Sequence, residues 1–187
     1  MPTYACAATA LQTGTVCGSA GITAVYIAQD SDIDWSAVTV ASDEISAWAF
    51  TGATKFVKLE PERKPSTLEA EYTRDNSYYE VNLNGLTFMG KSTAQALALA
   101  NLKECCSIVA VVYLSDGSSR VVGKENIGGS FVNPVAKAKV VRHLDSAGQF
   151  GGGAENGARD EIDIQAQHQQ PMLFTSIDMA TMDSTYV

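Results

Sequence analysis

The sequence predicts a mainly β protein, an antiparallel β-sandwich or barrel with one flanking α-helix and extended arms. Several segments alternate between apolar and polar residues, and others are β-branched apolar runs that end at Gly, Asn or Asp turns. A single segment near the middle has helical periodicity. The 187 residues have the size of one domain. We expect this domain over residues 21–180, with an N-terminal arm (1–20) and a C-terminal tail (181–187).

The first elements follow from composition. Residues 1–20 are rich in Ala, Thr, Gly and Ser, which is typical of an irregular arm. Residues 22–30 are β-branched and aromatic, so we expect a strand, followed by a polar loop over 31–42. Residues 44–50 and 55–60 flank a short Gly-containing turn, and this arrangement predicts a hairpin.

The clearest pattern lies between residues 67 and 84. On both arms apolar residues alternate strictly with polar ones, and residues 74–77 between the arms have turn composition. Alternation on two consecutive strands predicts a hairpin with one buried face and one solvated face. The solvated face carries Glu69, Glu71 and Glu80 close together.

The period changes after this hairpin. Residues 92–106 begin with a Ser/Gln capping box, are rich in Ala and Leu, and repeat their apolar positions at helical spacing. Residues 107–123 are two apolar runs around Asp116-Gly117, the strongest hairpin signal in the chain. Two alternating strands, 137–144 and 161–167, are joined by a Gly-rich loop, and residues 172–178 predict a last short strand.

Charge and hydropathy exclude two classes of protein. The formal net charge is −8, the chain has no basic run, and charged residues make up only 18%. A negative field repels the phosphate backbone, so we do not expect a nucleic-acid-binding protein. No stretch of 18 apolar residues is present and the N-terminus lacks the pattern of a secretory signal, so we expect synthesis and assembly in the cytoplasm. The few charges indicate a surface that other subunits cover.

One motif points toward an enzyme. From Gly85 to Ser92 the chain reads Gly-Leu-Thr-Phe-Met-Gly-Lys-Ser, which matches the phosphate-binding loop of nucleotide hydrolases. However, the four residues after Gly85 continue a strand pattern, and such enzymes need a parallel sheet built from repeated strand–helix units. We therefore interpret the match as a strand-to-helix corner and keep P-loop nucleotide binding as an alternative function.

No other catalytic, cofactor or metal motif is convincing. Residues 30–34 imitate the start of a calcium loop, but Trp35 stands where such a loop needs Gly. The two histidines, His143 and His168, have no partners at metal-ligand spacing. We predict a protein that is not an enzyme, with no catalytic residues, cofactor or metal. A cation at residues 30–34 and a disulfide between Cys6 and Cys17 are left open.

The chain as a whole resembles the tail tube proteins of tailed bacteriophages. The resemblance rests on four stretches: YACAATALQTGTVCGSAGI with its two cysteines, VYIAQDSDID, the helix STAQALALANLKECC, and GQFGGGAENGARDEIDIQAQHQQPMLF. It implies a β-sandwich subunit with a flanking helix, six of which form a ring. It also implies that the rings stack into the virion tail tube through which the genome leaves the capsid.

This resemblance supplies the main functional expectation, a major tail tube subunit. The expected partners are further copies of the chain and other tail proteins, with DNA as transiting, unbound cargo and no membrane. The alternative within this class is another ring protein of a virion or injection system, such as a connector or a minor tail subunit. A lumen should not hold DNA, so we expect the polar face of the hairpin to line it. The candidate channel-lining residues are Glu69, Glu71, Glu80, Asn82 and Asn84.

Overall fold

A computed structural model describes residues 21–52, 56–59, 66–73, 77–89, 107–144 and 159–177. In chain order the strands are β1 (Ile22–Gln29), β2 (Thr39–Ala41), β3 (Glu44–Ala47), β4 (Val57–Leu59), β5 (Thr67–Thr73), β6 (Tyr78–Met89), β7 (Ile108–Leu114), β8 (Ser119–Val122), β9 (Glu125–Ile127), β10 (Ser130–Val132), β11 (Ala136–Leu144), β12 (Arg159–His168) and β13 (Phe174–Thr175). A single 3₁₀ turn, η1 (Asp30–Asp32), follows β1.

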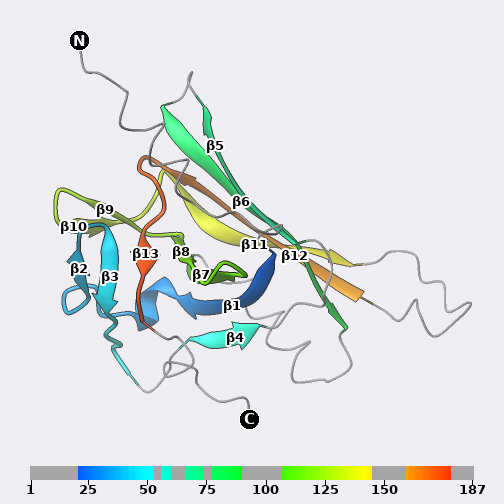
Figure 1. Ribbon diagram of the computed structural model, residues 1–187, viewed down its shortest axis with the longest axis horizontal. Helices are drawn as coiled ribbons and strands as arrows, with labels where there is room; N and C mark the ends of the chain where they lie inside the picture. Colours follow the sequence, from blue (N-terminus) through cyan, green and yellow to red (C-terminus); the bar gives the residue numbers. More distant parts are fainter. Residues whose placement is uncertain are drawn as a thin grey trace, which may run out of the picture.

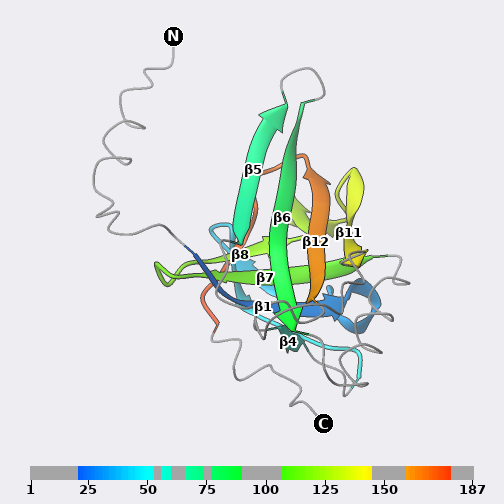
Figure 2. The same cartoon turned by 90° about the vertical axis from the view of Figure 1, so that its right-hand side faces the viewer.

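The described strands form four sheets. Two are four-stranded, with the orders β4–β1–β7–β8 and β11–β12–β6–β5. The other two, β13–β3–β2 and the hairpin β9–β10, are smaller. All pairs are antiparallel except β13 with β3. The strands of the two larger sheets cross steeply, and the upper end of the β5–β6 hairpin extends past its neighbours (Figures 1 and 2).

A first apolar core joins the two four-stranded sheets. Val25, Ile27 and Ile108 from one sheet share this cluster with Leu83 and Ile164 from the other, and all are at most 1% exposed. The burial of each such side chain contributes about 1.5–3 kcal/mol. The core therefore covers only one face of the sheet β11–β12–β6–β5.

A second core lies on the opposite face of the sheet β4–β1–β7–β8. Tyr26, Val109 and Val111, which alternate with the residues of the first core, pack there with Trp48 and Phe56. The central strands β1 and β7 are thus buried on both faces. Their sequences are accordingly continuous apolar runs, as expected for strands with no solvated side.

The expected mainly β, antiparallel class is confirmed. The hairpins β5–β6 and β7–β8 occur as predicted, and the two strands predicted on either side of the Gly-rich loop, β11 and β12, pair with each other. None of the described sheets closes into a barrel. The predicted helix (92–106), the arm (1–20), most of the Gly-rich loop, the tail (181–187) and all four cysteines lie outside the described residues.

Two predictions about residues 31–60 are wrong. The segment 31–42 is not only a loop, because it contains η1 and β2. The expected hairpin between 44–50 and 55–60 does not form: β3 pairs with β2 and β13, whereas β4 pairs with β1. The apolar residues that suggested two paired strands serve the second core instead, where the rings of Trp48 and Phe50 contact Phe56 edge-on.

The apolar side of the β5–β6 hairpin is only partly covered. Val81 and Leu83 are fully buried, and Leu68 and Tyr79 pack against the first core. Ala70 is exposed and Tyr72 is 52% exposed, contrary to the expectation that this whole side packs inside. The hairpin projects beyond the opposing sheet (Figure 2), and there the Tyr72 ring packs beside the Tyr79 ring with 5.1 Å between the ring centroids.

Candidate functional site

The candidate site is the polar face of the sheet β11–β12–β6–β5, on the side away from the first core. Along β5, Thr67, Glu69 and Glu71 are exposed, whereas Leu68 between them packs on the first core. Successive side chains of a strand point to opposite faces, so this alternation assigns the glutamates to the side away from the first core.

The ladder between β5 and β6 brings the five predicted residues onto that face. Glu69 lies opposite Asn82, Glu71 lies opposite Glu80, and Asn84 continues the same series on β6. The three glutamates are exposed and the two asparagines are half-buried. Their common face is a structural finding, while the role of that face as a channel lining stays a prediction.

The polar face continues onto the next two strands. Asn82 lies opposite Gln165 on β12, and Gln165 lies opposite Lys139 on β11. Glu80 lies opposite Gln167 in the same way. The alternation of β11 and β12 is visible in the sequence, but which strand each pairs with is not. The residues on these two strands were therefore missed as members of the candidate site.

Charge is distributed unevenly across this face. We define the acidic edge as Glu69, Glu71 and Glu80, and the basic edge as Lys137 and Lys139. Both lysines are exposed, and Ala138 between them is 1% exposed and belongs to the first core. Lys139, opposite Gln165, therefore shares the outer face with the glutamates, whereas Lys137 lies in an irregular part of β11 between Ala136 and Lys139 and its face does not follow from the pairing. Half-buried Asn and Gln side chains lie between the two charged edges.

The structure shows why a glycine stands at position 85, the first residue of the apparent nucleotide-binding motif. Between the pairs Leu83–Ile164 and Leu86–Ile162, β6 has two residues where β12 has only Asp163. This is a β-bulge, and Gly85 adopts a φ of 74°, which favours glycine. The Gly85 N–H donates to Asp163 Oδ1 at 3.0 Å.

The strand that follows the bulge argues against the nucleotide-binding alternative. From Leu86 to Met89 the chain is a regular strand paired with β12 up to Arg159. A phosphate-binding loop must curl its backbone N–H groups around the phosphate, and a strand cannot do so. The first five residues of the motif thus have the wrong conformation, and the last three, 90–92, lie outside the described residues.

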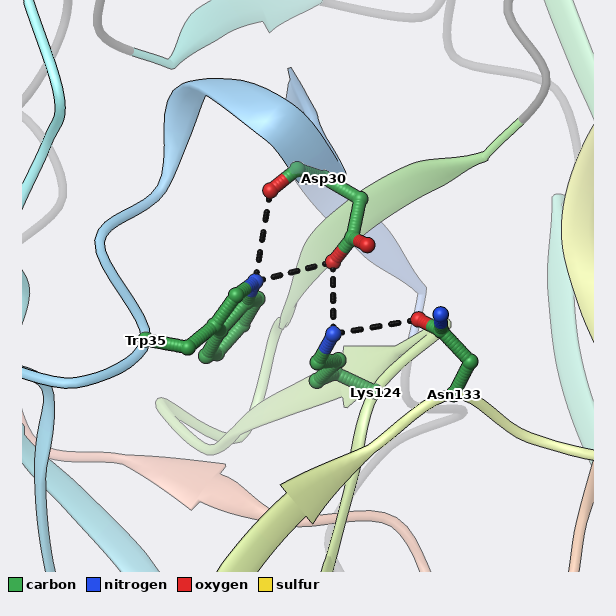
Figure 3. Close-up of polar contacts among 4 residues, drawn as sticks. All are labelled: Asp30, Trp35, Lys124 and Asn133. Atoms are coloured by element: carbon green, nitrogen blue, oxygen red, sulfur yellow. Dashed lines mark hydrogen bonds and ion pairs between the residues drawn. The ribbon is translucent and has the colours of Figure 1, made fainter.

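A second polar group surrounds the buried Lys124, at the junction of β1 with the β9–β10 hairpin (Figure 3). The Lys124 ammonium, 5% exposed as a residue, donates to Asp30 Oδ1 at 2.8 Å and to Asn133 Oδ1 at 3.0 Å. It also lies 4.6 Å from the Trp35 ring centroid, and the indole N–H donates to the same Asp30 oxygen at 2.8 Å. The buried ammonium is thus paired with a carboxylate and an amide oxygen and faces an aromatic ring, which indicates a structural clamp.

His168 is buried at the end of β12 beside Gly123. The Gly123 N–H donates to His168 Nε2 at 3.0 Å, so the ring proton of the neutral imidazole is on Nδ1. Burial lowers the pKa of His168 to about 4. Gly123 has a φ of 96°, and a Cβ there would collide with the Ile108 carbonyl oxygen and lie 2.8 Å from the Ala138 Cβ. This position therefore requires glycine.

Glu125 is the other buried ionisable residue that no charged group balances in the described chain. Its Oε1 accepts from the Gln170 N–H at 2.7 Å, while Oε2 has no hydrogen-bond partner among the described residues. Burial raises the pKa of the Glu125 carboxyl, and the N–H groups of Gln170 and Gln169 oppose this shift. His168 and Glu125 are 0% and 1% exposed, so neither is accessible to a substrate as an acid or base.

The calcium-like segment does not converge on a common point. The Asp30 carboxylate contacts Lys124, and the Asp34 carboxylate accepts from the Ser36 N–H and hydroxyl. Within the described parts of the chain, no group of three or more His, Cys, Asp or Glu side chains is arranged to hold a metal ion.

Comparison with known proteins gives no assignment: no family model, curated protein or solved structure matches this chain. The described residues also contain no helix of the length and apolar character needed to cross a membrane.

Proposed function

We propose that the chain is a structural subunit of a tube, the major tail tube protein of a tailed bacteriophage, whose hexameric rings stack around a DNA-conducting channel. The observation that carries this proposal is the sheet β11–β12–β6–β5. It has one face in the core, one continuous polar face, and two edge strands that pair with nothing else in the described chain. This sheet packs through the first core against a second antiparallel sheet, which suits the two-layered sandwich subunit that the sequence resemblance implies.

The dimensions of the sheet suit a channel wall. The 12 residues of β6 span about 40 Å. Six copies of a four-stranded sheet would supply roughly 24 strands, and at about 4.8 Å per strand the backbone circle would be roughly 37 Å across before any tilt. Strand tilt widens such a circle further. A backbone circle of this size, lined by side chains, suits the passage of a DNA duplex.

The chemistry of the polar face suits DNA as cargo that must not bind. Four described carboxylates, those of the acidic edge and Asp163, stand against the two lysines of the basic edge. Neutral Asn and Gln side chains fill the middle. An excess of negative charge avoids the counterion release that would hold phosphates on a basic wall.

A variant with a basic lining tests the proposal. Glu80→Lys together with Asn82→Lys puts ammonium groups on β6, opposite Glu71 and Glu69, without changing an edge strand. Assembled tubes of this variant should retain duplex DNA and protect it from nuclease. Added salt should release the DNA, because the logarithm of the binding constant falls with the logarithm of the salt concentration with a slope of about −0.9Z, where Z is the number of phosphates that the protein neutralises.

The matched control carries the same number of new lysines elsewhere. Ala41→Lys with Ala47→Lys uses two exposed positions on β2 and β3. It should bind DNA, if at all, only on the outside, where nuclease digests it. Equal protection in both variants, or none in the first, would argue against a lumen lined by β6. Isolated rings that never stack would favour the other virion or injection-system ring protein, such as a connector.

A further inference from the structure

Lys124 and Asn133 face each other at the open end of the β9–β10 hairpin. The last ladder pair at that end is Glu125 with Val132, and Lys124 and Asn133 are the next residue on either side. Their side chains are in contact, with 3.0 Å between Lys124 Nζ and Asn133 Oδ1. The hairpin therefore holds a primary amine beside a side-chain amide, one bond away from the amide carbon.

The surroundings of the Lys124 amine also supply a base. The Lys124 side chain is 6% exposed, and the Trp35 ring centroid lies 4.6 Å from Nζ. The Asp30 carboxylate lies 2.8 Å from Nζ, within the reach of a general base. The Trp35 N–H donates to the same Asp30 oxygen and so orients the carboxylate (Figure 3). A nucleophile, an electrophile and a base thus meet at one point.

We propose that Lys124 and Asn133 form an isopeptide bond within the chain, with Asp30 as the group that transfers protons. Asp30 takes one proton from the Lys124 ammonium, and the neutral Nζ attacks Asn133 Cγ. The new bond joins Nζ to Cγ, and the bond from Cγ to Nδ2 breaks. The leaving nitrogen takes both protons that Nζ has lost and departs as ammonium, so Asp30 ends as the carboxylate that it was at the start. No oxidant or reductant is needed.

Two features of Asn133 suit this reaction. Asn133 is exposed, so the leaving ammonium has a path to solvent. Pro134 follows it and has no backbone N–H, so attack by the next backbone nitrogen, the usual route by which asparagine loses ammonia, is closed here. The bond would close residues 124–133 into a covalent loop, which restricts the unfolded chain as a disulfide does. It lies within one chain and does not depend on the proposed tube.

Tryptic digestion and mass spectrometry of the full chain test this bond. The protein is incubated folded, then denatured and digested with trypsin, which cuts after Lys and Arg. An unmodified Lys124 gives the separate peptides 121–124 and 125–137, whereas an acylated Lys124 is not cut. We expect one peptide, 121–137, lighter than its sequence by one ammonia, with fragments that place the link between Lys124 and Asn133. Complete cleavage after Lys124, even after prolonged incubation of the folded wild type, overturns the proposal.

Three variants assign the roles of the residues. Lys124→Arg keeps the positive charge and should show no link. Asp30→Asn removes the proton acceptor with little change in size and should slow formation of the linked peptide by about a hundredfold or more. Asp34→Asn is the matched control, because the Asp34 carboxylate contacts Ser36, and it should link like the wild type.

Circular dichroism checks that each variant folds, and the wild-type digest decides the presence of the bond even if one does not. Linkage in folded Asp30→Asn at the wild-type rate overturns the role of Asp30. An ammonia loss that leaves cleavage after Lys124 intact lies at another residue and overturns the bond.

Discussion

His168 shows how one buried residue links stability to pH. Its ring is fully buried and its pKa is about 4, whereas an exposed histidine titrates near 6.5. Between these values the unfolded chain binds more protons than the folded chain. The contribution of neutral His168 to the free energy of unfolding is therefore complete above pH 6.5. It is lost as the pH falls toward 4, by roughly 3 kcal/mol in all. The raised pKa of Glu125 acts in the opposite direction.

We predict that His168→Gln removes this pH dependence and retains an acceptor for the Gly123 N–H. The measurement is the free energy of unfolding in urea between pH 7 and pH 4.5 for both proteins. The difference between them isolates His168, because Glu125 contributes equally to both. If the free energies of unfolding of the two proteins change with pH in parallel, His168 does not have the lowered pKa that its burial is expected to cause.

Gly123 occupies a position that leaves no room for a side chain. Its positive φ and the contact of an added Cβ with the Ile108 carbonyl oxygen both oppose any side chain. We predict that Gly123→Ala lowers the free energy of unfolding by more than about 2 kcal/mol, from backbone strain and overpacking together. Gly117→Ala is the matched control: its φ of 82° is also positive, but nothing lies within 4 Å of the added Cβ. Equal losses from the two changes would contradict the steric account.

At the scale of the element, the β5–β6 hairpin contains a repulsive pair of like charges. Glu71 and Glu80 lie directly opposite each other, and like charges in that position destabilise a strand pair. We predict that Glu80→Gln raises the melting temperature by about 1–3 °C at low salt, and that salt abolishes the gain. Asn82→Asp, which creates a second like-charged pair opposite Glu69, should lower it. In the proposed tail tube this repulsion between Glu71 and Glu80 would be retained because the same carboxylates also repel DNA.

The hairpins were predictable because their signals are local. Strict alternation indicated β5 and β6, and the Asp116-Gly117 turn indicated β7 and β8. The β9–β10 hairpin, with its Gly128-Gly129 turn, was overlooked although that turn is a recognised signal. The pairing of β4 with β1 could not be predicted, since an apolar strand does not indicate its partner in the sequence.

The same limit applies to the candidate site. The five residues of β5 and β6 share a face because of a two-residue period that the sequence displays. Gln165 and Lys139 join them through strand pairs that span tens of residues, and no local pattern encodes such pairs. Gly85 is an instructive case: its bulge lets Leu83 and Leu86, three residues apart, both face the core. In the sequence this glycine matched the first position of a nucleotide motif.

At the scale of the whole molecule, the proposal of a subunit completed by other copies draws on three features: a sheet with a polar outer face, a hairpin whose Tyr72 is exposed, and a net charge of −8. Each feature alone is compatible with a monomer. Together they suit a ring whose inner wall is the sheet β11–β12–β6–β5.

Electron cryomicroscopy of the purified, assembled full-length chain tests this central claim most directly. We predict hollow sixfold rings or tubes in which β6 lies on the inner wall, with the side chains of Glu80 and Asn82 facing the channel. Particles with these two residues on the outer surface, or only monomers at every concentration tried, would contradict the account.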